Sequence, residues 1–415
     1  MHLVVRLLLL LAIPLALSRG QPHPEHNEGY FTDSSHQETW GTGESSPCLR
    51  VIPSNTAFAL HLYHLMASES PSRNISLLSI SAALTMLSLG ARGHAQTQIL
   101  QGLGFNLTEM TESDIHQGFQ YLLHTLNLAN DMLETHVGNA LFLNDTMAFY
   151  ESPLFHTNFR DSVGAAQLIN GHVKKETQGK IANLVSKLSK DTMMVLVNYI
   201  YFKTLWEKPF SPSKTSPQDF YVDESTTVQV PMKWQGDHHH WYLCDRYLPF
   251  SVLWMNYDGD AVVFFILLNQ GKMMQVEEAL TPEILIRWNN LLQKKAYFYR
   301  KLELRFPRFS ISGSYELDQI LPKLGFTELF SEQANFSGIT KTLNLKMSKS
   351  FHKAVLDVNE VSTKAGAATG FSIAFKSAPK QPRVLRVNWP FLMVIFSTIA
   401  QSILLLGKVI DPTKP

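Results

Sequence analysis

The sequence predicts an α+β fold, in which helices fill the front of the chain and strands fill the back. Two observations favour this class. Apolar residues recur at helical spacing up to residue 187, whereas short runs of β-branched and aromatic residues dominate from residue 193. Such segregation is typical of α+β domains and argues against alternating βαβ units. Because no Pro/Gly/Ser-rich linker separates the two parts, the 415 residues are expected to form one large domain rather than two or three.

The helical part starts at Pro53. Phe58, Leu62 and Met66 fall on one face of a helix with 3.6 residues per turn. Gly90 ends the next helical pattern, as glycine often does at a helix C-terminus. The same periodicity predicts the further helices 81–90, 94–102, 113–128, 171–187, 276–293 and 317–324.

The strand part is a series of short apolar or alternating runs of strand length. The predicted strands are 193–203, 218–222, 227–233, 240–248, 251–257, 261–268, 302–312, 351–359, 384–387, 391–398 and 402–409.

The composition is that of a folded protein, with 45% hydrophobic and 17% charged residues. The 36 basic and 35 acidic residues nearly cancel, so no global field favours nucleic acid, and a polyanion would need a local patch. Two cysteines, Cys48 and Cys244, are too few for a disulfide scaffold. They either pair with each other or remain buried as small hydrophobes.

Residues 1–20 are typical of a secretory signal peptide. Arg6 precedes an unbroken apolar stretch, Leu7 to Leu17, and Ser18 and Gly20 suit a cleavage site. The stretch is shorter than the about 20 residues that a membrane anchor needs, and later apolar runs are strand-sized. We therefore expect a secreted, extracellular protein without a membrane span. Polar residues 21–52 are expected to form a flexible tail ahead of the domain, 53–415.

In a secreted protein, Asn-x-Ser/Thr triplets are acceptors for N-linked glycans, and this sequence has four of them. A glycoprotein is expected, with Asn74, Asn106, Asn144 and Asn335 as its candidate sites.

No motif for catalysis is present. The sequence contains no phosphate-binding glycine loop, no His-Glu-x-x-His helix and no Gly-x-Ser-x-Gly elbow. The run His238, His239 and His240 is not expected to bind a metal, because successive strand residues face opposite sides. It is interpreted as a solvated strand or turn edge. We expect neither an enzyme nor a cofactor.

One segment of about 20 residues between two predicted strands is unusually long for a loop in a compact domain, which favours a functional loop. Residues 360–379 alternate in character if they are treated as a latent strand. The residues on the side that would be buried are Thr363, Ala365, Ala367, Thr369, Phe371 and Ile373, and the opposite side carries Lys364.

At this point the sequence resembles a known family. Phe351–Glu360 (FHKAVLDVNE), followed by Thr363 and Ala365–Ala368, is similar to the hinge of the serpins. The resemblance runs from about Pro53 to Pro415 and is strongest to the secreted antitrypsin-like group. The other segments that carry it are Asn198–Trp206 (NYIYFKTLW), Phe309–Tyr315 with Leu321–Gly325, and Pro390–Leu392 with Leu406–Val409.

The resemblance implies a metastable fold of three β-sheets and about nine helices with an exposed reactive-centre loop at about 360–382. Such a loop offers a bait bond to a serine protease and, once cut, inserts into the central sheet. The bait bond aligns with Lys376–Ser377, so trypsin-like proteases are the expected targets. A register shifted by one residue would place Phe375 at the bond and favour chymotrypsin-like proteases.

The resemblance also assigns gating residues. Glu360 and Arg308 match a hinge ion pair, and Trp206 matches the residue at the top of the opening sheet. A polar cluster beneath that sheet, the shutter, matches Ser79, Asn198 and His352.

The chain departs from the family pattern in the hinge and in two deletions. The hinge residues are Glu360, Ser362, Thr363, Lys364, Ala365, Gly366, Ala367 and Ala368, with Ser362 where the family has glycine and Lys364 where it has glutamate. A run after Asn74-Ile75 is cut short, and roughly ten residues are missing after Leu143, about 15 Å of chain if helical. These deletions predict reduced stability or failed secretion. The alternatives to an inhibitor are therefore a hormone-carrier-like protein and an inert, unstable relative.

A basic cluster suggests a second partner. Six positive charges between residues 294 and 308 could bind a sulfated glycosaminoglycan, although an exposed charged face is an equal alternative. The candidate residues are Lys294, Lys295, Arg300, Lys301 and Arg305, with Arg308 beside them. The protein is otherwise expected to be a monomer that binds neither nucleic acid nor membrane.

Overall fold

The computed structural model describes most of the chain, namely residues 47–67, 73–75, 77–126, 133–146, 154–244, 250–294, 298–341, 345–358 and 383–414. Eight α-helices lie within these ranges: α2 (Pro47–Ala67), α3 (Leu77–Gly90), α4 (His94–Gly102), α5 (Glu112–Leu126), α6 (Ser162–Glu176), α7 (Met273–Ala279), α8 (Pro282–Lys294) and α9 (Leu317–Ile320).

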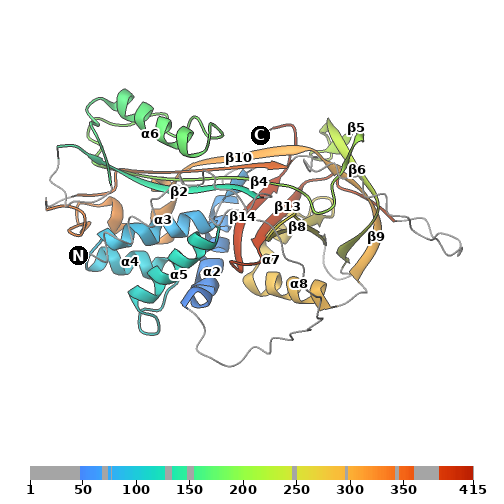
Figure 1. Ribbon diagram of the computed structural model, residues 1–415, viewed down its shortest axis with the longest axis horizontal. Helices are drawn as coiled ribbons and strands as arrows, with labels where there is room; N and C mark the ends of the chain where they lie inside the picture. The colour runs from blue at the N-terminus through green and yellow to red at the C-terminus, as the bar shows by residue number, and fades with distance from the viewer. Residues whose placement is uncertain are drawn as a thin grey trace, which may run out of the picture.

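A five-stranded sheet runs along the molecule, with α6 on one face and α3 on the other (Figure 1). Its strand order is β10-β11-β4-β2-β3. The bounds are β2 (Leu133–Asn144), β3 (Phe155–Thr157), β4 (Met194–Thr204), β10 (Phe309–Glu316) and β11 (Lys349–Val358).

The remaining strands form a nine-stranded sheet in the order β1-β14-β13-β8-β7-β6-β9-β12, with β5 paired to β6. The bounds are β1 (Arg73–Ile75), β5 (Ser211–Tyr221), β6 (Thr227–Cys244), β7 (Phe250–Asn256), β8 (Ala261–Leu268), β9 (Tyr299–Pro307), β12 (Arg383–Arg386), β13 (Phe391–Ser397) and β14 (Ser402–Val409).

The α+β class is confirmed. The resemblance implies three sheets, but the described strands form two, because β6 joins two groups of strands into one sheet. The first part of this strand pairs with β5 up to Trp234, and its last part, from Trp241, pairs with β7. The ladder between β6 and β9 slips between Gln235 and His238, as a β-bulge does. One long strand therefore serves both groups of strands.

Some predicted boundaries were wrong for local reasons. The helix expected at 171–187 is α6, which begins at Ser162 because Asp161 caps it by accepting a hydrogen bond from Gly164 N at 3.0 Å. It ends where the Thr177 hydroxyl bonds Val173 O and Gly179 takes a φ of 84°. The helix expected at 276–293 is interrupted before Pro282 and forms α7 and α8.

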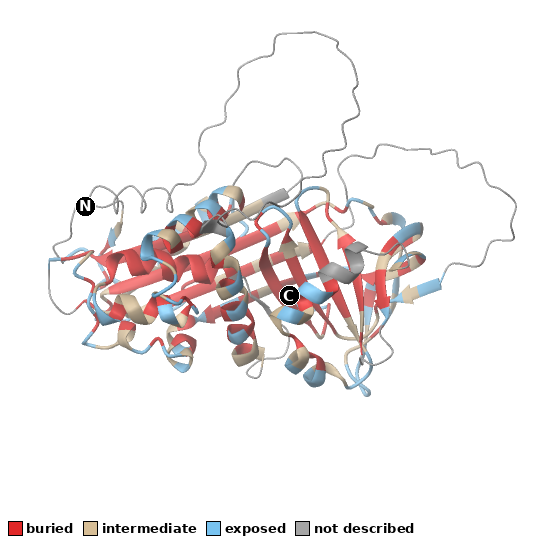
Figure 2. Cartoon of the chain, turned by 90° about the horizontal axis from the view of Figure 1, so that it is seen from below, coloured by how far each residue is buried: buried red, intermediate tan, exposed pale blue. Residues whose placement is uncertain are grey.

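Buried residues concentrate in the strands and on the helix faces that cover them (Figure 2). The main hydrophobic core joins α2–α5 to both sheets, and a smaller core lies between α6 and the five-stranded sheet. Phe142, Phe159 and Val197 are fully buried in this smaller core. None of the described helices is long and apolar enough to cross a bilayer. Cys244 is a free, exposed thiol, which is neither of the two states expected from the sequence.

A buried amide in α2 provides a test of the fold. Asn55 is 0% exposed, and neither its Oδ1 nor its Nδ2 has a hydrogen-bond partner among the described residues. Because an unsatisfied buried polar group costs about 1–3 kcal/mol, Asn55→Leu should raise the melting temperature measured by differential scanning calorimetry. Asn139→Leu is the control: this amide accepts a hydrogen bond from Asn198, so its loss should lower the melting temperature. A lower melting temperature for Asn55→Leu would contradict this assignment.

Candidate functional site

The centre of the five-stranded sheet is a parallel pair, β4 and β11, called here the seam. The two strands are directly paired from Val195–Lys349 to Lys203–Asp357. The chain leaves β11 at Val358 and enters residues 359–382, which contain the predicted reactive loop and lie outside the described residues. The loop therefore starts at the C-terminal end of the seam, next to the pair Lys203–Asp357.

This topology leaves a defined place for one more strand. A strand that turned back from Val358 into the seam would run antiparallel to β11 and also antiparallel to β4. Two antiparallel ladders would replace one parallel ladder, and parallel pairing is slightly less stable per residue. Insertion would thus add backbone hydrogen bonds and improve their geometry. The seam can store free energy in this way as long as it stays closed.

Beneath the seam, the structure brings together the three predicted shutter residues. Asn198 from β4 accepts a hydrogen bond from the Ser79 hydroxyl at 2.9 Å and donates one to the Ser79 carbonyl at 2.9 Å. His352 from β11 contacts the same Asn198 oxygen through Nδ1. All three side chains are buried. The cluster therefore ties α3, β4 and β11 to one another.

A fourth member, Asn139 in β2, was missed from the sequence. Its Oδ1 accepts a hydrogen bond from Asn198 Nδ2 at 2.5 Å. Two opposed asparagines in neighbouring strands, Asn139 and Asn198, are in register with each other. Asn139 was missed because β2 itself was not predicted: Gly138 and Asn139 are residue types that are depleted in strands.

The hydrogen bonds in the shutter determine the state of His352. Asn198 Oδ1 is an acceptor, so Nδ1 of His352 must carry the proton that it shares with this oxygen. Burial lowers the pKa of His352 to about 3, because the interior disfavours the charged imidazolium. The shutter therefore holds a neutral imidazole at pH 7.

Trp206 lies just beyond the end of β4 and is 2% exposed. Its ring stacks on Tyr257 with centroids 4.5 Å apart, and the two residues form an isolated β-bridge. The Phe210 ring meets it edge-on at 5.8 Å. Burial raises the pKa of the Tyr257 hydroxyl. This aromatic stack fixes the C-terminal end of β4 to the nine-stranded sheet.

Arg308 is exposed and lies between β9 and β10. The β10–β11 ladder ends at the pair Phe309–Val358, so Arg308 is next to the point where the loop begins. Its predicted partner Glu360 is outside the described residues. So are the reactive bond, Lys376 and Ser377, and the remaining hinge residues, Ser362, Thr363, Lys364, Ala365, Gly366, Ala367 and Ala368.

The predicted basic cluster does not form a single surface. Arg300 and Lys301 are successive strand residues on opposite faces of β9, and only Lys301 is exposed. Arg305 shares the Lys301 face but pairs with Glu303 at 2.9 Å. Lys294 ends α8, and neither its side chain nor Lys295 belongs to the described part.

The neighbouring strand β12 adds a basic residue that the sequence did not indicate. Arg386 is exposed and stands directly opposite Arg305 in the parallel β9–β12 ladder. Residues paired in register share a face of the sheet. Lys301, Arg305 and Arg386, here called the basic face, therefore gather on one side of β9 and β12.

The candidate glycosylation sites differ in exposure. Asn106 and Asn335 are exposed. Asn144 is 6% exposed and donates its Nδ2 to the Thr192 carbonyl at 3.2 Å. Asn106 also donates its Nδ2, to Glu109 at 2.8 Å, so burial is what sets Asn144 apart. Asn74 lies in β1, and its side chain is outside the described residues.

The position of the predicted deletion after Leu143 coincides with an unusually short crossover. β2 ends at Asn144, and β3 begins at Phe155 as its parallel neighbour. Parallel strands usually need a connection of a dozen or more residues. The core is nevertheless covered at this point, because Phe142 is 0% exposed and stacks on Phe155 with centroids 5.0 Å apart.

The histidine run is not one solvated edge. His238 and His239 are exposed, whereas His240 is 4% exposed, so the interpretation as a solvated edge was wrong for His240. Alternation along β6 explains the difference between His239 and His240. Within the described part of the chain, no group of three or more His, Cys, Asp or Glu residues could hold a metal ion.

Comparison with known proteins agrees with this geometry. A family model described as "Serpin (serine protease inhibitor)" matches residues 53–412. Kallistatin of Pongo abelii is 64% identical over 427 residues, and the alignment covers 100% of both chains. That alignment is longer than this chain of 415 residues, as expected if the chain has deletions.

Two solved structures are similar over most of the chain. The crystal structure of human glycosylated kallistatin has a TM-score of 0.82 and 61% identity, and the match covers 89% of this chain and 100% of that one. The structure of cleaved kallistatin complexed with heparin has a TM-score of 0.71 and 65% identity over 75% of this chain and 95% of that one. The seam, the shutter and these matches have one explanation: the chain belongs to the serpin family.

Proposed function

We propose that this protein is a secreted serine protease inhibitor that acts as a suicide substrate. Membership of the serpin family supports this function, and the observation that carries it is the closed seam. The reactive loop begins where the seam ends, and the seam has room for one antiparallel strand only if β4 and β11 separate. The protein thus acts as a substrate that the protease cleaves once and then cannot release.

The chemistry starts at the bait bond. The protease serine attacks the carbonyl carbon of the bait residue, the peptide bond to the next residue breaks, and its nitrogen leaves as an amine. The bait residue is then held to the protease as an ester. Insertion of the freed loop into the seam moves this ester away from its original position. The protease stays trapped for as long as this ester is not hydrolysed.

The specificity of the inhibitor depends on which residue provides the bait carbonyl. We assign this role to Lys376, because Lys376–Ser377 aligns with the bait bond in the family pattern. The lysine ammonium suits proteases with a carboxylate in the specificity pocket. This makes trypsin-like proteases the targets. If Phe375 provides the carbonyl instead, chymotrypsin-like proteases are favoured.

Incubation with trypsin tests both the mechanism and the bait residue. We expect a complex that survives boiling in SDS. On a denaturing gel it should migrate at the mass of the protease plus that of the inhibitor without the released residues 377–415. Lys376→Ala should remove the complex with trypsin, whereas Phe375→Ala should retain it. Cleavage of the wild-type protein without a complex, and without a rise in thermal stability, would contradict the inhibitor function. A complex with chymotrypsin that depends on Phe375 would keep the mechanism and overturn the assignment of Lys376.

We also assign a sulfated glycosaminoglycan to the basic face. Support comes from the solved complex of cleaved kallistatin with heparin and from the position of Lys301, Arg305 and Arg386 on one side of β9 and β12. The interaction is electrostatic, so it should weaken steeply with salt.

Removing charges from the basic face should weaken heparin binding in proportion. An exposed ion pair contributes about 0.2–1 kcal/mol, so Lys301→Ala and Arg386→Ala should each raise the Kd for heparin by a factor of about 1.4 to 5. Surface plasmon resonance at two salt concentrations measures both the loss and its salt dependence. Arg160→Ala, at an exposed arginine in the turn between β3 and α6, is the matched control and should leave the Kd unchanged. Equal losses in all three variants would mean that binding is non-specific.

Glycan occupancy follows from exposure. We assign N-linked glycans to Asn106 and Asn335, whose side chains are exposed in the folded protein. Asn144 is expected to stay unmodified, because its amide is buried. Modification also requires passage through the secretory pathway, which the signal peptide at residues 1–20 would direct.

A further inference from the structure

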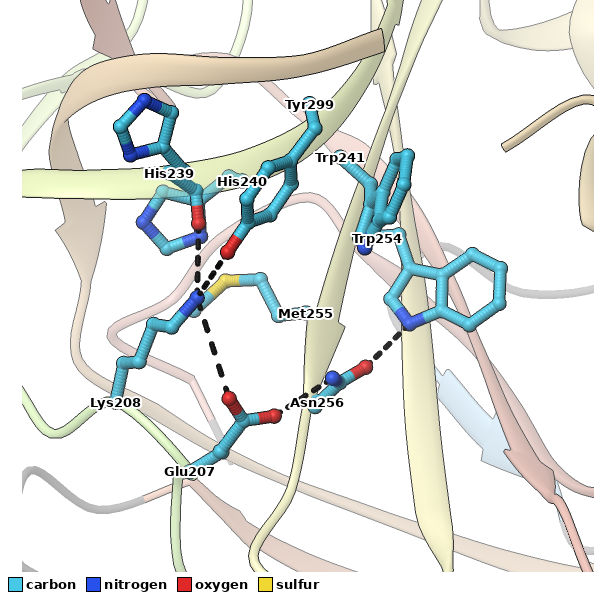
Figure 3. Close-up of a pocket in the computed structure, with 9 residues that line it drawn as sticks. All are labelled: Glu207, Lys208, His239, His240, Trp241, Trp254, Met255, Asn256 and Tyr299. Carbon is cyan, nitrogen blue, oxygen red and sulfur yellow. Dashed lines mark hydrogen bonds and ion pairs between the residues drawn. The ribbon is translucent and has the colours of Figure 1, made fainter. Parts of the chain in front are cut away.

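A pocket of about 160 Å³ lies just beyond Trp206, where β4 leads towards β5 (Figure 3). A cavity of about 150 Å³ in another protein holds benzene, so this volume suits one small ring. The pocket is separate from the seam and the shutter. It borders the basic face, because His239 pairs with Lys301 and Tyr299 lies on the same face of β9 as Lys301. Its lining residues are Glu207, Lys208, His239, His240, Trp241, Trp254, Met255, Asn256 and Tyr299.

The pocket contains one cation with donor capacity to spare. Lys208 Nζ donates to the His239 carbonyl at 2.9 Å and to the Tyr299 hydroxyl at 3.0 Å. An ammonium has three N–H donors. The nearest carboxylate oxygen, on Glu207, is 4.0 Å away, beyond hydrogen-bond distance. One Lys208 donor is therefore left for a ligand.

The carboxylate of Glu207, which faces Lys208 in the pocket, is held in place by hydrogen bonds. Asn256 Nδ2 donates to one oxygen of Glu207 at 2.6 Å, and the Trp254 indole N–H donates to Asn256 Oδ1 at 2.6 Å. Figure 3 shows this series of hydrogen bonds from Trp254 through Asn256 to Glu207, with Lys208 on the other side of Glu207. The oxygen of Glu207 nearest to Lys208 is not the one that Asn256 contacts. A positive group can approach this second oxygen.

His240 adds a buried donor. It is 4% exposed, and its Nε2 has no hydrogen-bond partner among the described residues. Burial, with a further contribution from the charge of Lys208, lowers the pKa of His240 to about 3, so the imidazole is neutral at pH 7. A neutral imidazole can donate from Nε2 to an anion. An unpaired polar atom of this kind, on a lining residue, indicates that the site is incomplete without a ligand or water.

Aromatic rings form the apolar part of the pocket. The Trp241 and Tyr299 rings lie 4.8 Å apart at 42°, and His239 stacks on Tyr299 at 5.2 Å. These contacts hold the rings in place, so a flat ligand can pack against them without first ordering the wall.

We propose that this pocket binds a small aromatic zwitterion of the free α-amino acid type. Its carboxylate meets the spare donor of Lys208 and Nε2 of His240, its ammonium meets the second oxygen of Glu207, and its ring packs against Trp241 and Tyr299. The separation of 4.0 Å between the Lys208 and Glu207 charges fits a ligand whose own two charges sit on one carbon. The proposal is independent of the inhibitor function.

Three probes of the same ring size test the proposal on the wild-type protein by isothermal titration calorimetry. L-phenylalanine carries both charges, 3-phenylpropanoate only the carboxylate and phenethylamine only the ammonium. L-phenylalanine should bind at least tenfold more tightly than either of the others. Equal binding of the three probes, or no binding of L-phenylalanine at millimolar concentration, would overturn the proposal without any variant.

Three variants then assign the charges. Lys208→Met should remove the advantage of L-phenylalanine over phenethylamine, and Glu207→Gln should remove its advantage over 3-phenylpropanoate. His240→Leu should weaken both carboxylate probes and leave phenethylamine unchanged. Lys214→Met is the matched control, because this lysine also lies over a ring, that of Trp234 at 3.5 Å, but outside the pocket. Retention of all three affinity ratios in Lys208→Met would place the ligand elsewhere.

Discussion

Thr363→Arg should convert the inhibitor into an ordinary substrate. Thr363 is the first residue of the predicted inward-facing set, so insertion would carry the new guanidinium into the buried side of the five-stranded sheet. Burying a charge without a partner costs several kcal/mol, and each 1.4 kcal/mol is a factor of ten in an equilibrium. The covalent complex with trypsin should therefore fall at least a hundredfold on denaturing gels, while the loop is still cut.

Two controls separate insertion from other effects. Thr363→Val keeps a β-branched side chain of the same size and should still form the complex. Lys364→Arg changes the neighbouring residue on the predicted outward side and should also behave as wild type. Cleaved wild-type protein should melt at a higher temperature than the intact protein, and cleaved Thr363→Arg should not. An undiminished complex in Thr363→Arg would mean that the inward register is wrong.

Acid should weaken the shutter through His352. Because burial lowers the pKa of His352 from 6.5 to about 3, protons bind the unfolded chain first as the pH falls. At pH 7 neither state is protonated at this residue, so its full contribution to stability is present. Between pH 6.5 and about 3 that contribution is lost, and at pH 4 the loss is about 3 kcal/mol. Guanidinium denaturation at pH 7 and pH 4 measures the difference.

The variant His352→Asn isolates this residue from others that titrate in the same range, such as His240. An asparagine can place its Nδ2 where the histidine has Nδ1, so it keeps the donor to Asn198 and cannot titrate. The stability lost between pH 7 and pH 4 should be about 3 kcal/mol smaller in this variant than in the wild-type protein. His124→Asn, at an exposed histidine of α5, should lose as much as wild type. If both variants follow the wild-type curve, His352 is not the acid-sensitive group.

Most strands of the nine-stranded sheet were predictable because they are buried on one or both faces. The runs 261–268 and 402–409 coincide with β8 and β14, whose residues are almost all buried. β2 was missed because Gly138 interrupts its pattern. That glycine is required by packing: a Cβ there would lie 2.2 Å from the hydroxyl of Tyr199 in the neighbouring strand. A contact between strands some 60 residues apart cannot be seen in a local pattern.

The site was predictable only through resemblance to a family. No local pattern distinguishes Ser79, Asn198 and His352 from other polar residues, because they converge from α3, β4 and β11. The basic cluster illustrates the opposite error. Closeness in sequence suggested one patch, but alternation along β9 separates Arg300 from Lys301, and Arg386 arrives from a strand some 80 residues away.

The place of β14 between β1 and β13 has a consequence for biosynthesis. β14 is synthesised long after β1, yet it pairs with β1 and lies against α3. Until residue 409 has emerged, the nascent chain can bury neither β13 nor α3 completely. Closure of the core must therefore wait for the synthesis of β14, with much apolar surface exposed in the meantime. A premature stop codon even a few residues upstream of β14 would leave a product with no way to close its core.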